Sequence, residues 1–443
     1  MSIAIPNVVP REGHTISRRN IDPDALKVLY RLKQSSYVAY LVGGGVRDLL
    51  LDQRPKDFDI GTSAHPYQVK RLFRNCWVIG RRFRLAHVKF GNKIIEVATF
   101  RRQVTADAES VNTKKDQTES NNTDTKKKAE LNQSTTFAKH QDPDRLIRRD
   151  NTFGTPAEDA FRRDFTINAL FYDIETFSVI DYVNGLDDLK AGVIRCIGDP
   201  SERFLEDPVR MLRAITFSAR LNFTIEPKTL RGIRRHKREI SKSAPARLLE
   251  EIYKILRSGN AETTFLKLKE IGLLEQIIPE LSKTDQAPLQ ASLARLDSYR
   301  RKFETAPETL NNSVLLGSLV VPLGFTGKRP PRKIRDGKSR RPPVDIGLRS
   351  LPVARRNADL LCQILGLQSR LTDRNPSSRS RNAIIHRTAF PDALTWLEIH
   401  GGLPELISDW RQLLPKPNVR PRTDRPTRRR HRKRAPRANP KKD

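Results

Sequence analysis

The sequence predicts a small mixed α/β domain near the N-terminus, followed by a mostly α-helical remainder. Two patterns carry this prediction. Between residues 22 and 100, short strand-like apolar runs alternate with helical periods. From Pro200 onward, helical periods with short breaks dominate. The 443 residues are enough for two or three domains with substantial cores.

Local signals place the elements of the α/β domain. Asp22-Pro23 is a helix start signal, and the leucine spacing after it is helical. Gly91-Asn92 is a favoured hairpin turn between two strands. In chain order, we expect a helix at 22–35, a strand at Tyr37–Val42, a short helix at Val46–Leu51, a strand at Phe58–Gly61, a helix at Pro66–Phe73, and strands at Leu85–Phe90 and Lys93–Phe100.

Three other segments lack the pattern of a folded core. Residues 103–142 are rich in Thr, Asn, Asp, Lys and Gln with almost nothing apolar to bury, so we expect a disordered insert. Residues 327–345 are rich in Pro and Arg and are expected to form a linker or loop. Lys416–Asp443 holds thirteen Lys or Arg residues against two Asp. We expect a disordered basic tail that suits phosphate contacts, the alternative being a solvated tail without a target.

Charge and cysteine content narrow the class of protein. The formal net charge of +32 favours a polyanionic partner, nucleic acid above all, over a merely soluble surface. Cys76, Cys196 and Cys362 form no C-x-x-C pair, so neither a disulfide framework nor a zinc site is predicted. Residues 1–20 lack the apolar core of a signal peptide, and the apolar stretch Val314–Phe325 is too short to span a bilayer. We therefore expect a cytoplasmic protein without a membrane span.

The most informative residues are the glycine triplet Gly43–Gly45 and the run Lys56-Asp57-Phe58-Asp59. In an extended strand, side chains repeat every second residue, so Asp57 and Asp59 point the same way. Two carboxylates so close favour a cation between them, and Mg²⁺ takes one or two carboxylates plus substrate phosphates. Backbone N–H groups at a glycine-rich helix start bind phosphate, and Arg47 adds a charged clamp. These features together predict nucleotide chemistry.

A third carboxylate is a candidate for the same site. Glu96 stands inside the apolar run Ile94–Phe100, where a charge is out of place unless it faces a cleft or a cation. The alternative is an edge-strand glutamate that faces water.

Two clusters of charged residues follow. The first consists of Arg162, Arg163, Asp164 and Asn168. It could bind a triphosphate and a ribose hydroxyl. On a helix, Asp164 and Asn168 would share a face. The ordinary alternative is a salt-bridged helix start. In the second cluster, Asp207 and Arg210 are three residues apart and can present an acceptor and a donor side by side to the edge of a base.

Taken together, these residues resemble a known family. Five motifs stand in the order LVGGGVRD, KDFD, IIEVATFR, RRDFTINAL and EDPVRMLRA. They are similar to those of the class II nucleotidyltransferases, which include CCA-adding enzymes and bacterial poly(A) polymerases. The resemblance covers about residues 21–256. It implies an α/β head of the polymerase-β-like nucleotidyltransferase type, with a mixed sheet, followed by mostly α-helical neck, body and tail domains.

The resemblance also implies roles for individual residues. The metal-binding carboxylates would be Asp57 and Asp59, with Asp164 counted as a further catalytic carboxylate beside Glu96. The residues that hold the triphosphate would be Gly43, Gly44 and Arg47. Those that contact the ribose and phosphates would be Arg162, Arg163 and Asn168. The residues that read the base would be Asp207 and Arg210.

Two further runs favour the polymerase branch. The run Val78–His87 (VIGRRFRLAH) resembles the signature that separates bacterial poly(A) polymerases from CCA-adding relatives, and Pro245–Glu251 (PARLLEE) resembles the polymerase neck. The implied activity is template-independent addition of AMP from ATP to RNA 3′ ends, with two Mg²⁺ ions and a link to RNA-decay machinery. Two alternatives stay open. They are a CCA-adding tRNA nucleotidyltransferase and an RNA-binding adaptor that has lost catalysis.

The implied domain organisation divides the chain into five parts. We expect an N-terminal extension at 1–20, a nucleotidyltransferase head at 21–175, a nucleotide-selecting neck at 176–260, a helical body and tail at 261–413, and a disordered basic tail at 414–443. The RNA-binding residues expected are Arg81, Arg82, Arg247, Arg428, Arg429, Arg430, Arg432, Lys433 and Arg434. A monomer is expected.

Overall fold

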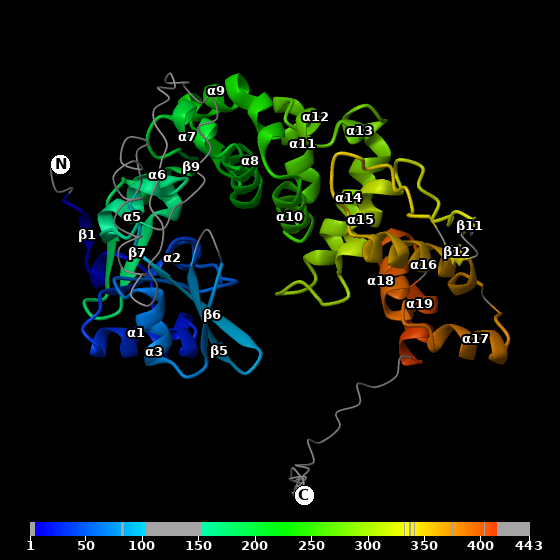
Figure 1. The fold of residues 1–443 in the computed structure, drawn as a ribbon, viewed down its shortest axis with the longest axis horizontal. Coiled ribbons are helices and arrows are strands. Elements are labelled where there is room, and N and C mark those ends of the chain that lie inside the picture. Colours follow the sequence, from blue (N-terminus) through cyan, green and yellow to red (C-terminus); the bar gives the residue numbers. More distant parts are fainter. Residues whose placement is uncertain are drawn as a thin grey trace, which may run out of the picture.

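The computed structural model describes residues 5–80, 84–102, 152–331, 333–335, 338–340, 342–373, 375–402 and 404–413. These residues form a head built on a twisted sheet and an arch of helices that leads away from it (Figure 1). The predicted fold class, a mixed-sheet α/β head before a mostly helical remainder, is confirmed. The insert predicted at 103–142 and the basic tail predicted at 414–443 lie outside the described residues.

Among the described residues, eight strands form the sheet of the head in the order β1-β8-β7-β2-β3-β6-β5-β4. The strands are β1 (Asn7–Val9), β2 (Ala39–Val42), β3 (Asp59–Thr62), β4 (Cys76–Ile79), β5 (Leu85–Phe90), β6 (Lys93–Thr99), β7 (Leu170–Asp173) and β8 (Ser178–Asp181). Of the neighbouring pairs, β3 and β6 run parallel and the others antiparallel. The sheet is therefore mixed.

Four of these strands were predicted from local patterns, and the hairpin is the clearest of them. Phe90 pairs with Lys93 across the turn, where Gly91 has a φ of +57°. This conformation suits glycine, and the predicted turn at Gly91-Asn92 is confirmed. The strands β1, β4, β7 and β8 were not predicted.

Helices cover the two faces of the sheet unequally. The head contains α1 (Pro23–Gln34), α2 (Gly44–Leu50), α3 (Pro66–Leu72), α5 (Pro156–Arg162), α6 (Gly185–Ala191) and the 3₁₀ turn η4 (Thr166–Asn168). The side chain of Asp22 caps α1 by accepting a hydrogen bond from the N–H of Asp24 at 2.8 Å, as the start signal predicted. Helices α1 and α3 pack on one face, where Val28, Leu29 and Leu32 join the main core.

The opposite face has a smaller apolar cluster. It consists of Val42, Phe100, Ala160, Ala169, Phe171, Ile180 and Ile197, and so lies over the β2, β7 and β8 side of the sheet. The face of β3, β6, β5 and β4 continues beyond this cluster and carries exposed side chains. Among the described residues no helix covers this part of the sheet, which we call the uncovered face, and the predicted carboxylates lie there.

Helices form most of the remaining described chain. They are α7 (Pro200–Glu206), α8 (Val209–Leu221), α9 (Pro227–His236), η5 (Lys237–Lys242), α10 (Pro245–Leu256), α11 (Ala261–Ile271), α12 (Leu274–Ile277), α13 (Pro279–Ser282), α14 (Gln286–Arg300), α15 (Asn312–Val320), α16 (Arg355–Leu371), α17 (Ser378–Ile385), α18 (Phe390–His400) and α19 (Pro404–Gln412). Two short strand pairs accompany them, β9 (Val193–Ile194) with β10 (Thr224–Ile225) and β11 (Lys333–Arg335) with β12 (Lys338–Arg340). None of the described helices has the length and apolar character needed to cross a bilayer.

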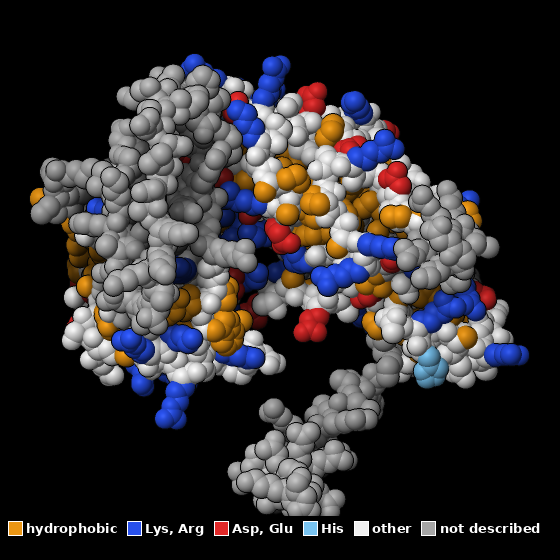
Figure 2. Space-filling model, in the orientation of Figure 1, with side chains coloured by type: hydrophobic (Ala, Val, Ile, Leu, Met, Phe, Trp, Pro, Cys, Tyr) orange, Lys and Arg blue, Asp and Glu red, His pale blue; other side chains and the backbone are white. Residues whose placement is uncertain are grey.

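Figure 2 shows that the molecule is hollowed between the head and the helical arch. Lys, Arg, Asp and Glu side chains border this hollow. A charged concave surface of this kind is suited to a charged or polar ligand rather than to an apolar one.

One local prediction is wrong. Asp164 and Asn168 do not lie on a common helix, because α5 ends at Arg162 and only Thr166–Asn168 forms a 3₁₀ turn. Phe165 between them is extended, fully buried and bridged to Cys196. Burial of this aromatic side chain and the bridge to a distant segment override the local helical spacing.

Candidate active site

The glycine turn lies between a cationic side chain and the aspartate run. Gly43 has a φ of +73°, and a Cβ there would approach Nη1 of Arg163 to 2.8 Å. A Cβ on Gly45 would lie 3.3 Å from the carbonyl oxygen of Asp57. The positive φ at residue 43 therefore favours glycine, and any side chain there would have to displace the guanidinium of Arg163. The turn also brings together three segments that are far apart in the sequence.

Three carboxylates meet on the uncovered face of the sheet. The parallel register pairs Ile60 with Val97, which places the preceding residues Asp59 and Glu96 side by side. Loss of solvation, followed by the charges of Glu96 and Asp57, raises the pKa of Asp59 to about 6, with Arg163 acting in the opposite direction. The predicted proximity of Asp57, Asp59 and Glu96 is therefore present in the structure.

Little positive charge within the protein compensates these carboxylates. Among the described residues, the side chain of Asp59 forms no hydrogen bond or ion pair, and Asp57 is 3.8 Å from the exposed Lys56. Glu96 lies 3.5 Å from Nε2 of His87, a buried nitrogen without a hydrogen bond. Carboxylates that repel one another without a partner are a site that a cation would relieve.

The carboxylates of this site fit magnesium without forming a complete metal cage. Within the described part of the chain, no group of three or more His, Cys, Asp or Glu side chains is already arranged to hold a metal ion. Mg²⁺ does not require such a cage, because it is usually held by one or two carboxylates together with substrate phosphates and water. Asp57 and Asp59 supply that number, and the raised pKa of Asp59 shows the need for positive charge.

Arg47 lies in the protein interior rather than in an open phosphate site. Its side chain is 2% exposed. Nε and Nη2 donate to Oδ1 of Asp48 at 2.8 and 2.6 Å, and Nη1 donates to Oδ1 of Asn168. The other oxygen of Asp48 accepts from Nη2 of Arg220 on α8 at 2.7 Å. Arg47 thus ties α2 to η4 and α8, and its predicted contact with a triphosphate stays a prediction.

Asp164 belongs to the same buried network. Oδ2 accepts from Nε of Arg213 at 2.7 Å, and Oδ1 accepts from Nδ2 of Asn168 at 3.1 Å and from the N–H of Phe165 at 2.9 Å. Burial alone would raise the pKa of Asp164, but Arg213 and the hydrogen bond from Asn168 bring it down to about 2. Asp164 and Asn168 therefore meet as predicted, although through a turn.

The two arginines before Asp164 have different surroundings. Arg163 donates from Nε and Nη2 to Oδ2 of Asp159 at 3.0 and 2.9 Å, and its Nη1 donates to the carbonyl oxygen of Asn168 at 3.2 Å. Arg162 is 4.0 Å from the other oxygen of Asp159. Arg163 borders Gly43 and also acts on Asp59, whereas the buried guanidinium of Arg47 borders Gly44.

The predicted base-reading residues have separate partners. Asp207 accepts two hydrogen bonds from Arg247 on α10, at 2.7 and 2.8 Å. Arg210 is buried and donates to Oε2 of Glu206 and to the carbonyl oxygen of Arg203, both at 3.2 Å. Base reading by Asp207 and Arg210 stays a prediction.

Sequence reasoning missed several members of this site and left others untested. It gave no role to Asp48, which it noted beside Arg47, and it did not identify Asp159 or Arg220. The spacing of Arg213 and Arg220, seven residues apart on α8, could have indicated a shared helical face. The predicted RNA-binding residues Arg81, Arg82, Arg428, Arg429, Arg430, Arg432, Lys433 and Arg434 lie outside the described residues.

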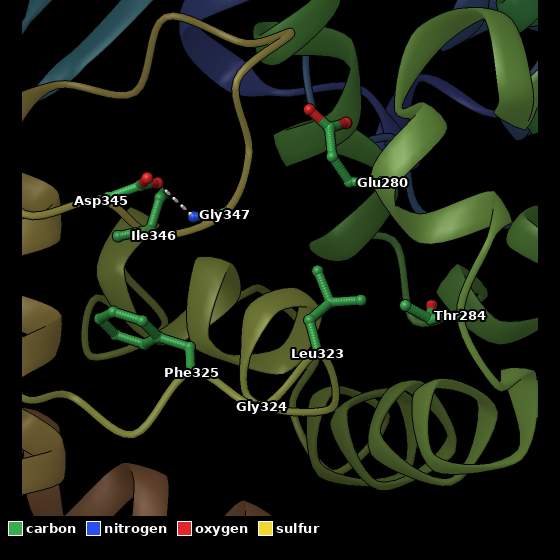
Figure 3. A pocket seen from close by; sticks show the side chains of 8 residues that line it. All are labelled: Glu280, Thr284, Leu323, Gly324, Phe325, Asp345, Ile346 and Gly347. Carbon is green, nitrogen blue, oxygen red and sulfur yellow. Dashed lines mark hydrogen bonds between the residues drawn. The ribbon is translucent and has the colours of Figure 1, made fainter.

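An open pocket of about 430 Å³ lies elsewhere, in the helical part. Leu323, Phe325 and Ile346 supply its apolar lining and Glu280 and Asp345 its carboxylates (Figure 3). Both carboxylates hold the local backbone: Glu280 accepts from the N–H groups of residues 349 and 350, and Asp345 from that of residue 347. The residues of the glycine turn and the carboxylate site do not line this pocket.

Comparison with known proteins finds family models that match two segments of the chain. Residues 39–195 match the family model "Poly A polymerase head domain", and residues 222–284 match "Probable RNA and SrmB-binding site of polymerase A". Poly(A) polymerase I of Salmonella typhi is 48% identical over 276 residues, which are 62% of this chain and 54% of that protein. The CCA-adding enzyme of Lactobacillus helveticus is 37% identical over 253 residues, 57% of this chain and 54% of that protein. The chain thus spans about half the length of the curated relatives it matches.

A solved structure shares the fold of most of the chain. The Bacillus stearothermophilus CCA-adding enzyme in complex with CTP aligns with a TM-score of 0.59 and 23% identity, covering 89% of this chain and 82% of that one. The likeness concerns the fold. The two family models assign a poly(A) polymerase head domain to residues 39–195 of the chain and an RNA-binding segment to residues 222–284.

Proposed function

We propose that this protein is a polynucleotide adenylyltransferase that adds AMP from ATP to RNA 3′ ends without a template. The observation that carries the proposal is the set of carboxylates with little compensating positive charge at β3 and β6, beside the glycine turn. Asp59 and Glu96 are side by side, and Asp57 is close enough to raise the pKa of Asp59. Such a site needs positive charge from outside the protein, which a nucleotide with its metal ions supplies.

In the proposed reaction, the RNA 3′-hydroxyl oxygen forms a bond to the α-phosphorus of ATP. The bond between that phosphorus and the bridging oxygen breaks, and pyrophosphate leaves with the electron pair. Two bound Mg²⁺ ions would assist by lowering the pKa of the hydroxyl and by neutralising the charge on the leaving group. Asp57 and Asp59 would hold the metal, with Glu96 beside them. No covalent enzyme intermediate is needed, so the residues act by position and charge.

The nucleotide is held, in this proposal, between the head and the helices that follow it. The glycine turn at Gly43 and Gly44 would face the triphosphate, with Arg163 as the nearest guanidinium. Arg47, Asp164 and Asn168 would fix the turn from behind through their buried hydrogen bonds. The pair formed by Asp207 and Arg247 joins α7 to α10 at the edge where a base would be selected, and Arg210 follows Asp207 by three residues. Arg162 would contact the ribose and phosphates.

A basic helix face supports RNA as the polymer. Four exposed arginines lie along α9 and the start of η5, at residues 231, 234, 235 and 238. None of them forms an ion pair with a described carboxylate. Residues three and four apart lie on one side of a helix, so these cations make a stripe that can follow a phosphate backbone. The stripe falls within the segment 222–284 that matches the RNA-binding model.

The polymerase branch is favoured over the CCA-adding branch by similarity. Identity is 48% to a poly(A) polymerase I and 37% to a CCA-adding enzyme, over comparable lengths. The adaptor alternative, an RNA-binding protein without catalysis, leaves the carboxylate set without a purpose. A cytoplasmic location, a monomeric state, the five-part domain division and a link to RNA-decay machinery complete the proposal.

An extension assay tests the proposal. The purified chain receives Mg²⁺ and either ATP or CTP, with an unstructured RNA oligomer or a tRNA that lacks its CCA end. We expect a long ladder from ATP on the oligomer, absent in Asp59→Asn. Glu175→Gln, an exposed carboxylate change near β7, is the matched control and should remain active. Addition of CTP and ATP confined to the tRNA would assign the CCA-adding activity instead, and RNA binding without any extension would favour the adaptor.

A further inference from the structure

A single row of side chains crosses the uncovered face of the head sheet. Trp77 on β4 pairs with His87 on β5, and His87 pairs with Glu96 on β6. Glu96 lies beside Asp59 on β3, because the next residues along these two strands are paired. Side chains of directly paired residues point to the same face. The row therefore leads from the edge of the sheet to the catalytic carboxylates.

Contacts along this row confirm the order given by the register. The rings of Trp77 and His87 have centroids 6.4 Å apart and are tilted by 54°. Nε2 of His87 lies 3.5 Å from Oε1 of Glu96. With strands about 4.8 Å apart, Trp77 is about 14 Å from Asp59, three strand spacings away. An RNA strand whose 3′ end lies at the carboxylates would reach Trp77 with a base upstream of its terminal nucleotide.

The far end of the row is apolar and open. Trp77 and Ile79 are each 38% exposed, and Ile94 on the same face is 44% exposed. Lys89 on β5 lies exposed between Trp77 and Ile94. Single exposed apolar side chains are ordinary, but three on one sheet face, with a lysine among them, form a surface that a partner could cover.

Nucleotide bases suit this surface better than a second protein does. An exposed aromatic ring with an adjacent cation is the combination that binds single-stranded nucleic acid, since every base has a face that can stack and every phosphate a charge. The surface is also continuous with the carboxylates where RNA would react. The chain as a whole carries a net charge of +32, which attracts RNA and repels other cationic surfaces.

We propose that Trp77, flanked by Ile79, Ile94 and Lys89, is a stacking platform for an unpaired base of the RNA substrate upstream of its reacting 3′ end. His87 supports the indole from the side of the carboxylates. The platform rests on the proposed function, because it takes its ligand from RNA held at Asp57, Asp59 and Glu96. It adds a subsite for the RNA that is separate from the nucleotide site at the glycine turn.

Intrinsic fluorescence tests the platform directly. The chain has three tryptophans, and Trp396 and Trp410 are buried, so Trp77 is the exposed one. We would titrate the full chain with a short oligo(A) that ends in a 3′-deoxynucleotide, without ATP, and follow binding independently by anisotropy of a labelled oligomer. We expect quenching that saturates with the anisotropy and is absent in Trp77→Phe.

Steady-state kinetics supply the second measurement. Trp77→Ala should raise the KM for a short RNA by roughly 5- to 150-fold, the range expected for one lost base stack, and leave the KM for ATP within about 3-fold. Trp77→Phe should retain most of the affinity and also guards against misfolding of the alanine variant. Tyr67→Ala, an aromatic that is 56% exposed on α3 over the other face, is the matched control and should change neither KM.

The outcomes separate the platform from the proposed function. Quenching without any adenylate transfer would support the platform and overturn the activity. Transfer by a chain whose Trp77 fluorescence does not respond to saturating RNA would overturn the platform alone. Equal RNA affinity of the wild-type chain and of Trp77→Ala would also overturn it.

Discussion

Replacement of Asp164 by asparagine is the sharpest test of the buried network. The carboxylate is 12% exposed and accepts hydrogen bonds from Nε of Arg213, from Nδ2 of Asn168 and from the N–H of Phe165. Asparagine keeps the shape and one acceptor oxygen but removes the negative charge. Arg213 would then keep its positive charge without its partner, in a part of the protein where charge is costly.

The pKa of Asp164 sets the size of the effect. Its value of about 2 lies below the ordinary 3.8, so the ionised carboxylate stabilises the folded protein. A difference of about 1.8 pKa units corresponds to roughly 2 kcal/mol at neutral pH. Because the folded pKa is depressed, this contribution is complete above about pH 5 and is lost as the pH falls, with about half remaining at pH 3.

Urea unfolding followed by circular dichroism measures the prediction. Asp164→Asn should lower the free energy of unfolding by roughly 2 kcal/mol at pH 7. The difference in unfolding free energy from the wild-type chain should become smaller as the pH falls toward 3. Asp207→Asn is the matched comparison, because Asp207 has an ion pair as short as that of Asp164 but its partner Arg247 is half-exposed. This variant should lower the free energy of unfolding by at most about 1 kcal/mol. An equal loss in the two variants, or a gap for Asp164→Asn that does not change with pH, would refute the assignment.

Four other predictions follow from the contacts described above. Asp48→Asn should lower the free energy of unfolding by about 3 kcal/mol, because Arg47 would stay buried without its carboxylate. Arg220→Met should lower it by at most about 1 kcal/mol, and urea titrations of both variants would check this order. Because the pKa of Asp59 is raised to about 6, its charge opposes folding at pH 7, so Asp59→Asn should raise the metal-free melting temperature there and not at pH 3. Gly43→Ala should lower the free energy of unfolding by roughly 1–3 kcal/mol and raise the KM for ATP. An unchanged KM would contradict the proposed binding of phosphate at the turn. Glutamine at all four arginines of α9 and η5 should flatten the slope of log K against log salt by about 3 units, as measured by RNA titration.

Local signals were sufficient for about half of the head. Helix α1 follows from the cap at Asp22 and from leucines on one face, and the β5–β6 hairpin follows from the turn at Gly91. The strands β7 and β8 were missed because each is four residues long and buried throughout, so neither shows an alternating pattern. The place of β7 beside β2 comes from pairing across more than 120 residues, which no local window contains, and β8 follows as its partner.

The site divides in a similar way. The proximity of Asp57, Asp59 and Glu96 could be predicted from the sequence. A charge at a strand start or inside an apolar strand conflicts with its surroundings unless it has a function. Asp48 and Arg220 could not be paired from the sequence, since 172 positions separate them and each is unremarkable in its own helix. Asp164 and Asn168 were expected to meet on a helix and meet instead through a turn, because Phe165 is drawn into the core.

The buried network explains how two distant parts of the site can keep a fixed relation. Asp48 and Arg47 belong to α2, which opens on the glycine turn, and Arg213 and Arg220 belong to α8 at the start of the helical arch. Buried ion pairs contribute little net stability, because desolvation offsets most of their attraction. Their hydrogen bonds nevertheless have strict geometry, and a shift of α2 against α8 would break several at once. We therefore propose that the charges on these two helices act mainly to hold the glycine turn in a fixed position relative to α8, which a purely apolar contact would fix less precisely.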